Sequence, residues 1–177
     1  MTTNEYKSGL YDAKIAVWNS AENYATAVDV ESVQMAGISF QNESGQLEGD
    51  DRITDVTSKT QSVEVRLRFG FKNLDVYEVL TGATNTESST TMDSMIIGEQ
   101  SMPYFALCVR VNGTEGDGDT QVFIPKCKIM DGFSVTMEKG AYVTPEVTAM
   151  AVYEGTTYGM GLIINHATGQ AVTIPPT

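Results

Sequence analysis

The chain has 177 residues, the usual size of a single domain, and 41% of them are hydrophobic, too many for a disordered acidic segment. Its 23 acidic and 11 basic residues give a formal net charge of −12. Half of that charge falls in residues 29–55, which hold seven acids and one base. This balance excludes a protein that grips nucleic acid or docks on an anionic membrane, because both need clustered Lys and Arg.

The composition favours β-structure, since Thr (21 residues) and Val (17) far outnumber Leu (7). No apolar run approaches the roughly 18–20 residues of a membrane helix, and the first residues show no secretory signal. The two cysteines, Cys108 and Cys127, do not make a disulfide framework. We expect two reduced thiols in a protein made in the cytosol, with a cross-strand bridge as the alternative.

The first part of the chain predicts two strands and a long loop. Residues 1–10 are expected to be a loosely held arm. Apolar and polar residues alternate over residues 11–17, which indicates a strand, and a second strand region covers residues 28–41. Residues 42–61 are polar, acidic and punctuated by glycine, so we expect a long functional loop. Its apolar anchors are Leu47, Ile53 and Val56.

Residues 62–71 form the clearest predicted strand, with apolar residues on one face only. The opposite face carries three charged residues, Glu64, Arg66 and Arg68. A helix of about two turns should follow directly, with Asn73 as its N-terminal cap and Gly82 at its C-terminal stop.

The rest of the chain predicts a Thr/Ser-rich loop at residues 84–94 and then mostly strands. Strands are expected at residues 104–111, 121–130, 133–138 and 143–153, with a last hairpin from residues 158–164 and 171–174. Turns should fall at residues 112–119, 131–132, 139–140 and 166–169. The whole is a mainly β domain over residues 1–177: a β-sandwich or partly open barrel of about eight strands with one flanking short α-helix.

The sequence offers little chemistry, and we predict no catalytic, cofactor or metal site. His166 is the only histidine and lies in a predicted turn, and no nucleophile elbow or phosphate-binding glycine loop is present. One His and two separated Cys fall short of the four ligands of a structural zinc site. Asp117 and Asp119 are spaced as in a calcium loop, but the rest of that loop is missing, and we interpret them as solvated turn carboxylates.

Seven segments follow one another in a characteristic order and spacing. They are VQMAGISF (33–40), LEGDD (47–51), VEVRL (63–67), DVYEVLTGA (75–83), MPYFAL (102–107), FIPKCKI (123–129) and VTPEVTAMAVY (143–153). In this order they resemble the major tail (tail tube) proteins of long-tailed, siphovirus-type bacteriophages. The likeness spans residues 11–154.

The resemblance implies a β-sandwich flanked by one helix, six copies of which form a ring, and rings that stack into a hollow tube. DNA would pass through the acidic bore into the host without specific binding. The implied partners are other copies of the chain, a tape-measure protein and tail terminator and tip proteins. The implied location is the virion, after synthesis in the host cytoplasm. The family uses no cofactor and no catalysis.

For subunit contacts we expect the long loop and the loop around residues 84–102. The candidates are Leu47, Asp50, Asp51, Ile53, Val56, Met95 and Met102. Glu64, Arg66 and Arg68 are candidates for the lumen or a subunit interface, with a solvated face as the alternative. Residues 155–177 would be a C-terminal hairpin or arm.

Other functions remain as alternatives. A type VI secretion-like tube protein shares the fold of the resembled family. A capsid or tail decoration or a carbohydrate-binding β-sandwich would also be non-enzymatic and would need an exposed row of aromatic residues. A glycosidase would need a pair of catalytic carboxylates, and no pair stands out in the sequence.

Overall fold

The computed structural model describes residues 7–49, 52–70, 73–89, 92–96, 98–99, 101–113, 118–135, 139–140, 143–155 and 157–176. The strands are β1 Lys7–Ser20, β2 Asn23–Tyr24, β3 Val28–Asp29, β4 Met35–Gly49, β5 Arg52–Arg68, β6 Thr84–Ser89, β7 Met92–Ile96, β8 Phe105–Gly113, β9 Thr120–Ser134, β10 Glu146–Ala151 and β11 Leu162–Asn165. The helix is α1 Leu74–Thr81. A mainly β fold with one short helix is thus confirmed for the described part of the chain.

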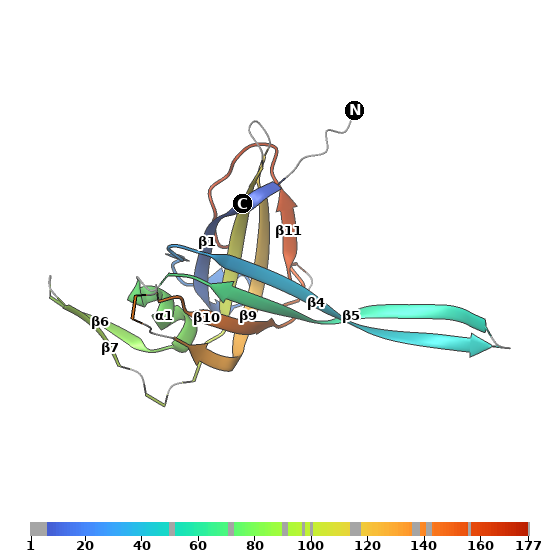
Figure 1. Cartoon of the computed structure of the whole chain (residues 1–177), viewed down its shortest axis with the longest axis horizontal. Helices are drawn as coiled ribbons and strands as arrows, with labels where there is room; N and C mark the ends of the chain where they lie inside the picture. Colours follow the sequence, from blue (N-terminus) through green and yellow to red (C-terminus); the bar gives the residue numbers. More distant parts are fainter. Residues whose placement is uncertain are drawn as a thin grey trace.

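Nine of these strands form one antiparallel sheet in the order β2-β1-β8-β9-β10-β5-β4, with β3 also paired to β1 and β11 to β9. Strands β6 and β7 form a separate two-stranded hairpin. The large sheet curls so that β4 and β5 cross over β1 and β8 (Figure 1). Its end strands β2 and β4 are not paired with each other, so the described strands do not close into a barrel.

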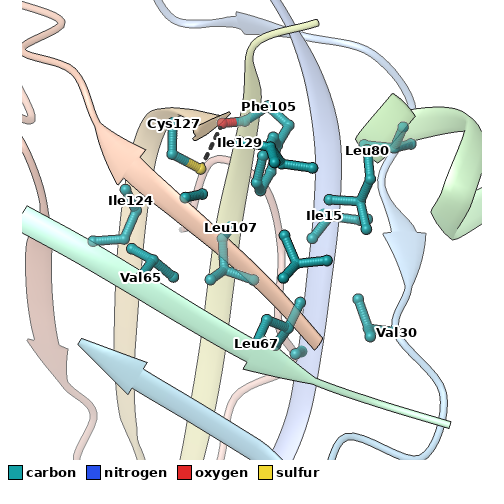
Figure 2. Packing of buried hydrophobic residues seen from close by; sticks show 14 of the residues in the cluster. Ile15, Val30, Val65, Leu67, Leu80, Phe105, Leu107, Ile124, Cys127 and Ile129 are labelled. Atoms are coloured by element: carbon teal, nitrogen blue, oxygen red, sulfur yellow. Dashed lines mark hydrogen bonds between the residues drawn. The ribbon is translucent and has the colours of Figure 1, made fainter. Parts of the chain in front are cut away.

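The concave face of the curled sheet holds the core. Side chains from β1, β5, β8, β9, β10 and α1 belong to a single buried cluster. In Figure 2, Val65 and Leu67 of β5 lie across from Leu107 of β8 and Ile15 of β1. Strands far apart in the sheet order touch because the sheet curls, and burial of these apolar side chains is the main stabilising term.

The predicted alternation in β5 and the predicted helix caps are confirmed. Val63, Val65 and Leu67 are at most 2% exposed. The side chain of Asn73 accepts a hydrogen bond from the Asp75 N–H at 2.8 Å. Gly82 has φ 72°, where a side chain would be strained and would meet Pro103, so glycine ends the helix.

Helix α1 covers one opening of the curled sheet with its apolar face. Tyr77 is 2% exposed, and its ring lies 5.0 Å from that of Phe133 on β9 and 5.9 Å from that of Phe69. The helix follows β5 after only a few residues, and both pack against the same core. The core therefore positions the strand and the helix together.

The prediction of loops at residues 42–61 and 84–94 is wrong. Residues 42–49 and 52–61 are the far halves of β4 and β5, which stay paired as far as Gly49 and Arg52. Residues 84–89 and 92–96 are the β6–β7 hairpin. Regular alternation of apolar and polar residues marks a strand that buries one face, and neither of these two segments shows it.

Three further predictions, for residues 131–132, 171–174 and 1–10, are also wrong. The 131–132 turn is absent because β9 continues to Ser134, and Gly132 with φ 83° lies where the β9–β10 register shifts. Strand β11 pairs with β9 instead of residues 171–174, which are not a strand. The expected N-terminal arm is shorter, since β1 begins at Lys7; residues 1–6 lie outside the described residues.

Replacing Leu67 with Ala should lower the free energy of unfolding by about 3 kcal/mol, because it opens a cavity in the concave face. Ile163→Ala, at a side chain that is 59% exposed, serves as the control and should cost less than about 0.5 kcal/mol. Urea unfolding followed by tryptophan fluorescence measures both. Equal losses in the two variants would contradict this assignment of the core.

Candidate interaction surfaces

The far halves of β4 and β5 form a two-stranded ribbon that projects away from the body (Figure 1). We call residues 42–61 the ribbon. At its base, residues 42–44 and 58–61 are all exposed, so neither face of the hairpin is covered there. An isolated two-stranded hairpin is only marginally stable in water, so a partner that packs on the ribbon would stabilise it.

Three predicted interface residues lie on the ribbon. Leu47 is paired with Asp55, and the neighbouring pairs are Gln46 with Val56 and Glu48 with Ile53. Asp50 and Asp51 lie outside the described residues. The ribbon holds five acidic and two basic residues, a formal charge of −3.

Met95 and Met102 lie elsewhere. Both are partly buried and pack against the core cluster, Met95 from β7 and Met102 from the segment before β8. The β6–β7 hairpin is further tied to α1, because the Asn85 side-chain N–H donates to the Asp75 carboxylate at 3.0 Å. In this chain the two methionines therefore fasten the segment between α1 and β8 to the body.

Glu64, Arg66 and Arg68 lie on the convex face of the large sheet, opposite the core, which we call the outer face. The Arg66 Nε lies 2.6 Å from Glu64 Oε1, and the Arg68 Nη2 lies 2.8 Å from Glu146 Oε2. A hollow of about 310 Å³ lies beside them, lined by Gly37, Ile38, Ser39, Gln41, Glu64 and Arg66. These partly exposed ion pairs contribute little stability and leave a polar surface open to a neighbour.

The C-terminal segment covers another part of the outer face. Val172 packs on Ala106, Cys108 and Phe123, with Tyr24, Tyr158, Leu162 and Ile174 around them. This second buried cluster lies on the side of β8 and β9 that faces away from the main core. Residues 155–177, expected as a hairpin or arm, thus include a strap over the outer face.

A buried ion pair holds this strap in place. Asp119 is 1% exposed, and its carboxylate lies 3.0 Å from the Arg110 Nε and accepts the Gln170 backbone N–H at 3.1 Å. The Gln121 side-chain N–H donates to the carbonyls of Gln170 and Ala171. The interpretation of Asp119 as a solvated turn residue is therefore wrong: the strap removes it from water and makes it a structural anchor.

His166 belongs to the same structural anchor. Its backbone N–H donates to the Asp119 carbonyl at 2.9 Å. A Cβ on Gly118 would collide with the backbone of His166, so only glycine permits this close approach. Nothing in the sequence predicted these contacts, because Asp119 and Gln170 are 51 residues apart.

The two thiols lie on opposite faces of the sheet. Cys108 belongs to the outer cluster, whereas Cys127 lies in the main core and donates to the Phe105 carbonyl (Figure 2). The alternative of a cross-strand bridge between them is therefore wrong for this fold. Burial raises the pKa of Cys108 to about 12 and raises that of Cys127 well above its usual value, so neither thiol is a ready nucleophile.

An aromatic cluster at the end of β1 was also missed by the sequence analysis. The Glu154 carboxylate accepts hydrogen bonds from Trp18 Nε1 at 2.7 Å, from Tyr24 Oη at 3.1 Å and from the Glu22 backbone N–H at 3.2 Å. Burial and the adjacent Glu154 charge raise the pKa of Tyr24. These contacts attach the segment after β10 to the start of the β1–β2 turn.

Two lysines stack on the aromatic rings of this cluster. The Lys126 Nζ lies 3.6 Å from the Trp18 ring centroid and 4.5 Å from that of Tyr104, and the Lys128 Nζ lies 4.9 Å from the Tyr104 centroid. We call Trp18, Tyr104, Lys126 and Lys128 the lysine patch. It joins amphipathic rings to two positive charges on the outer face.

No known protein family matches the chain, and no curated protein sequence is similar to it. In the parts of the chain that the structure describes, no three His, Cys, Asp or Glu side chains gather as a metal site. None of the described helical residues belongs to a helix long and apolar enough to cross a membrane. The ribbon, the outer face and the lysine patch are thus the features from which a function can be inferred.

Replacing Asp119 with Asn should lower the free energy of unfolding by about 2–4 kcal/mol, because it removes the buried carboxylate charge that faces the Arg110 guanidinium at 3.0 Å. The strap should also loosen, so Cys108 should react faster with a thiol reagent while Cys127 stays protected. Mass spectrometry of labelled peptides distinguishes the two. Asp131→Asn, the same change at an exposed acid, is the control, and equal labelling of Cys108 in both variants would contradict the anchor.

Alkaline pH should destabilise the chain through its buried thiols. The folded state keeps both thiols protonated, whereas an unfolded thiol ionises above about pH 9. The stabilising contribution is therefore complete below that pH and is lost as the pH rises toward 12. Between about pH 8 and about pH 10.5, the free energy of unfolding should fall in both chains. The fall should be about 2 kcal/mol smaller in Cys108→Ala than in the unaltered chain. Identical pH profiles would contradict the burial of this thiol.

Proposed function

We propose that this chain is the structural subunit of a phage tail tube, which forms stacked hexameric rings through which DNA is ejected into the host. The observation that carries the proposal is the ribbon. It extends residues 42–49 and 52–61 from the body as two paired strands whose base is exposed on both faces. A neighbouring subunit would provide the packing surface that the chain itself does not provide at that base.

The open edge of the large sheet supports the same proposal. Strand β4 ends the sheet order, and Phe40 continues the partly buried row of Ala36 and Ile38 although it is 56% exposed. Long open edges invite pairing with other chains, and a closed ring of head-to-tail contacts covers them. We infer that the curled sheet and its helix are this protein's version of the tail-tube β-sandwich, with ring neighbours covering β4 and Phe40.

The charge fits a conduit that does not bind its cargo. Six copies would carry six times −12, a formal charge of −72 per ring. An acidic wall repels phosphate over about 8–10 Å at physiological salt, so DNA would pass without binding to the wall. The proposed partners are other copies of the chain, a tape-measure protein and the tail terminator and tip proteins.

The alternatives receive less support. A carbohydrate-binding module needs an open aromatic platform, whereas the Trp18 ring is covered by Lys126. A type VI secretion-like tube would use the same surfaces. A tape-measure reading frame next to the gene distinguishes the phage tube from that secretion tube.

Shortening the ribbon tests the proposal. Gln41 and Ser62 are paired, so replacing residues 42–61 with Asn-Gly joins them by a tight turn and keeps the core of β5. The shortened chain should fold with an unchanged unfolding midpoint but stay monomeric under conditions in which the unaltered chain forms rings or tubes. Negative-stain microscopy and sedimentation velocity measure assembly.

The β6–β7 hairpin provides a matched control. Thr86 and Ser94 are paired, so replacing residues 87–93 with Asn-Gly shortens a second hairpin in the same way. If the ribbon-shortened chain forms tubes as readily as the unaltered chain, the ribbon is not the assembly element. An unaltered chain that stays monomeric at every concentration, even with its tail partners, would overturn the proposed function.

A further inference from the structure

The outer face holds most of the basic residues of this acidic chain. Six of the 11 basic residues lie on this face of the large sheet: Lys14, Arg66, Arg68, Arg110, Lys126 and Lys128. Four of them are matched by carboxylates of the same chain at 2.6–3.2 Å, in the pairs Lys14–Asp29, Arg66–Glu64, Arg68–Glu146 and Arg110–Asp119. Within the described residues, Lys126 and Lys128 form no ion pair.

The lysine patch therefore carries two ammonium groups that are not held in an ion pair by any described carboxylate. Both ammonium groups approach the same Tyr104 ring, so two like charges lie close together. The Glu154 carboxylate accepts hydrogen bonds from Trp18 and Tyr24, so one negative charge borders the patch, but it forms no ion pair with Lys126. Stacking on aromatic rings stabilises each cation without removing its charge, so the two lysines together outweigh this one carboxylate.

We propose that the lysine patch docks the acidic ribbon of a second copy of this chain. The inference rests on the proposed function, because it names the surface that receives the ribbon. The ribbon carries −3, and the patch carries two unmatched positive charges. The ribbon points away from its own body, so it meets a patch on another copy (Figure 1).

The patch chemistry suits such a partner. The Trp18 and Tyr104 rings hold the two ammonium groups in place, and these groups attract acidic side chains. Because the ribbon and the patch are different surfaces of one chain, the contact is head-to-tail and can repeat from copy to copy. A nucleic acid would also offer anions, but it would be repelled by the −12 charge of the chain as a whole.

Charge reversal on each side tests the docking. Lys128→Glu should weaken self-association about fivefold, and Asp50→Lys/Asp51→Lys on the ribbon should weaken it at least as much, because each places like charges in contact. A mixture of the two variants should associate again, since the unaltered ribbon of the patch variant then meets the unaltered patch of the ribbon variant. Sedimentation equilibrium of labelled chains measures all three.

The matched control is Lys139→Glu, the same charge change at an exposed turn, which should stay within about twofold of the unaltered chain. If Lys128→Glu fails to fold, Lys128→Gln replaces it, and a weaker salt dependence of its self-association is then the expected result.

Two results overturn the docking while the proposed function stands. One is unchanged association of the patch variant while the ribbon-shortened chain no longer assembles. The other is failure of the mixed variants to associate. A Lys128-dependent affinity for a short DNA duplex, with self-association unchanged, would make a polyanion the occupant and likewise overturn the docking. An unaltered chain that never associates overturns both proposals.

Discussion

The fold depends on the burial of one face of β5. Its apolar side chains, Val63, Val65 and Leu67, lie in the concave core, while the alternating charged residues point outward and pair with neighbouring carboxylates. Strand β5 therefore has one face in the apolar core and the other on the polar outer face of the sheet. The same strand extends into the ribbon on one side and leads into α1 on the other, so the register of β5 positions both.

The outer face is divided into regions of different character. Over β8 and β9 it is sealed by the C-terminal strap, which the Asp119–Arg110 pair anchors. Toward β5 it is open and carries compensated ion pairs. The lysine patch lies where the last residues of β1 meet the middle of β9, and its two ammonium groups form no ion pair with a described residue. A chain built for assembly needs such a division, because only the uncovered regions can meet a neighbour.

The sequence predicted the elements that bury a face. The alternation in β5, the helix over residues 74–81 with its Asn73 cap and Gly82 stop, and the β8–β9 hairpin all follow from local periodicity and turn chemistry. The ribbon escaped prediction because its few apolar residues, Leu47, Ile53 and Val56, do not alternate regularly with polar ones. Gly132 was misread for a related reason, since a bulge and a turn share the same residue preferences.

The candidate surfaces could be predicted only in part. The ribbon residues and the outward position of Glu64, Arg66 and Arg68 were accessible from polarity and alternation, whereas Met95 and Met102 pack against the core. The Asp119 anchor and the lysine patch join residues that lie far apart in the chain. Such contacts leave no local pattern, because their partners meet only after the sheet has curled.

The amino-acid sequence by itself determined the mainly β class, the single short helix, the inward face of β5 and the acidity that argues against holding DNA. These properties follow from composition and from periodicities that act over a few residues. Tertiary structure decided that the polar segment is a ribbon, that the thiols lie on opposite faces, and that Asp119 is buried. Each of these depends on which strands become neighbours, and that is set by long-range packing of the core.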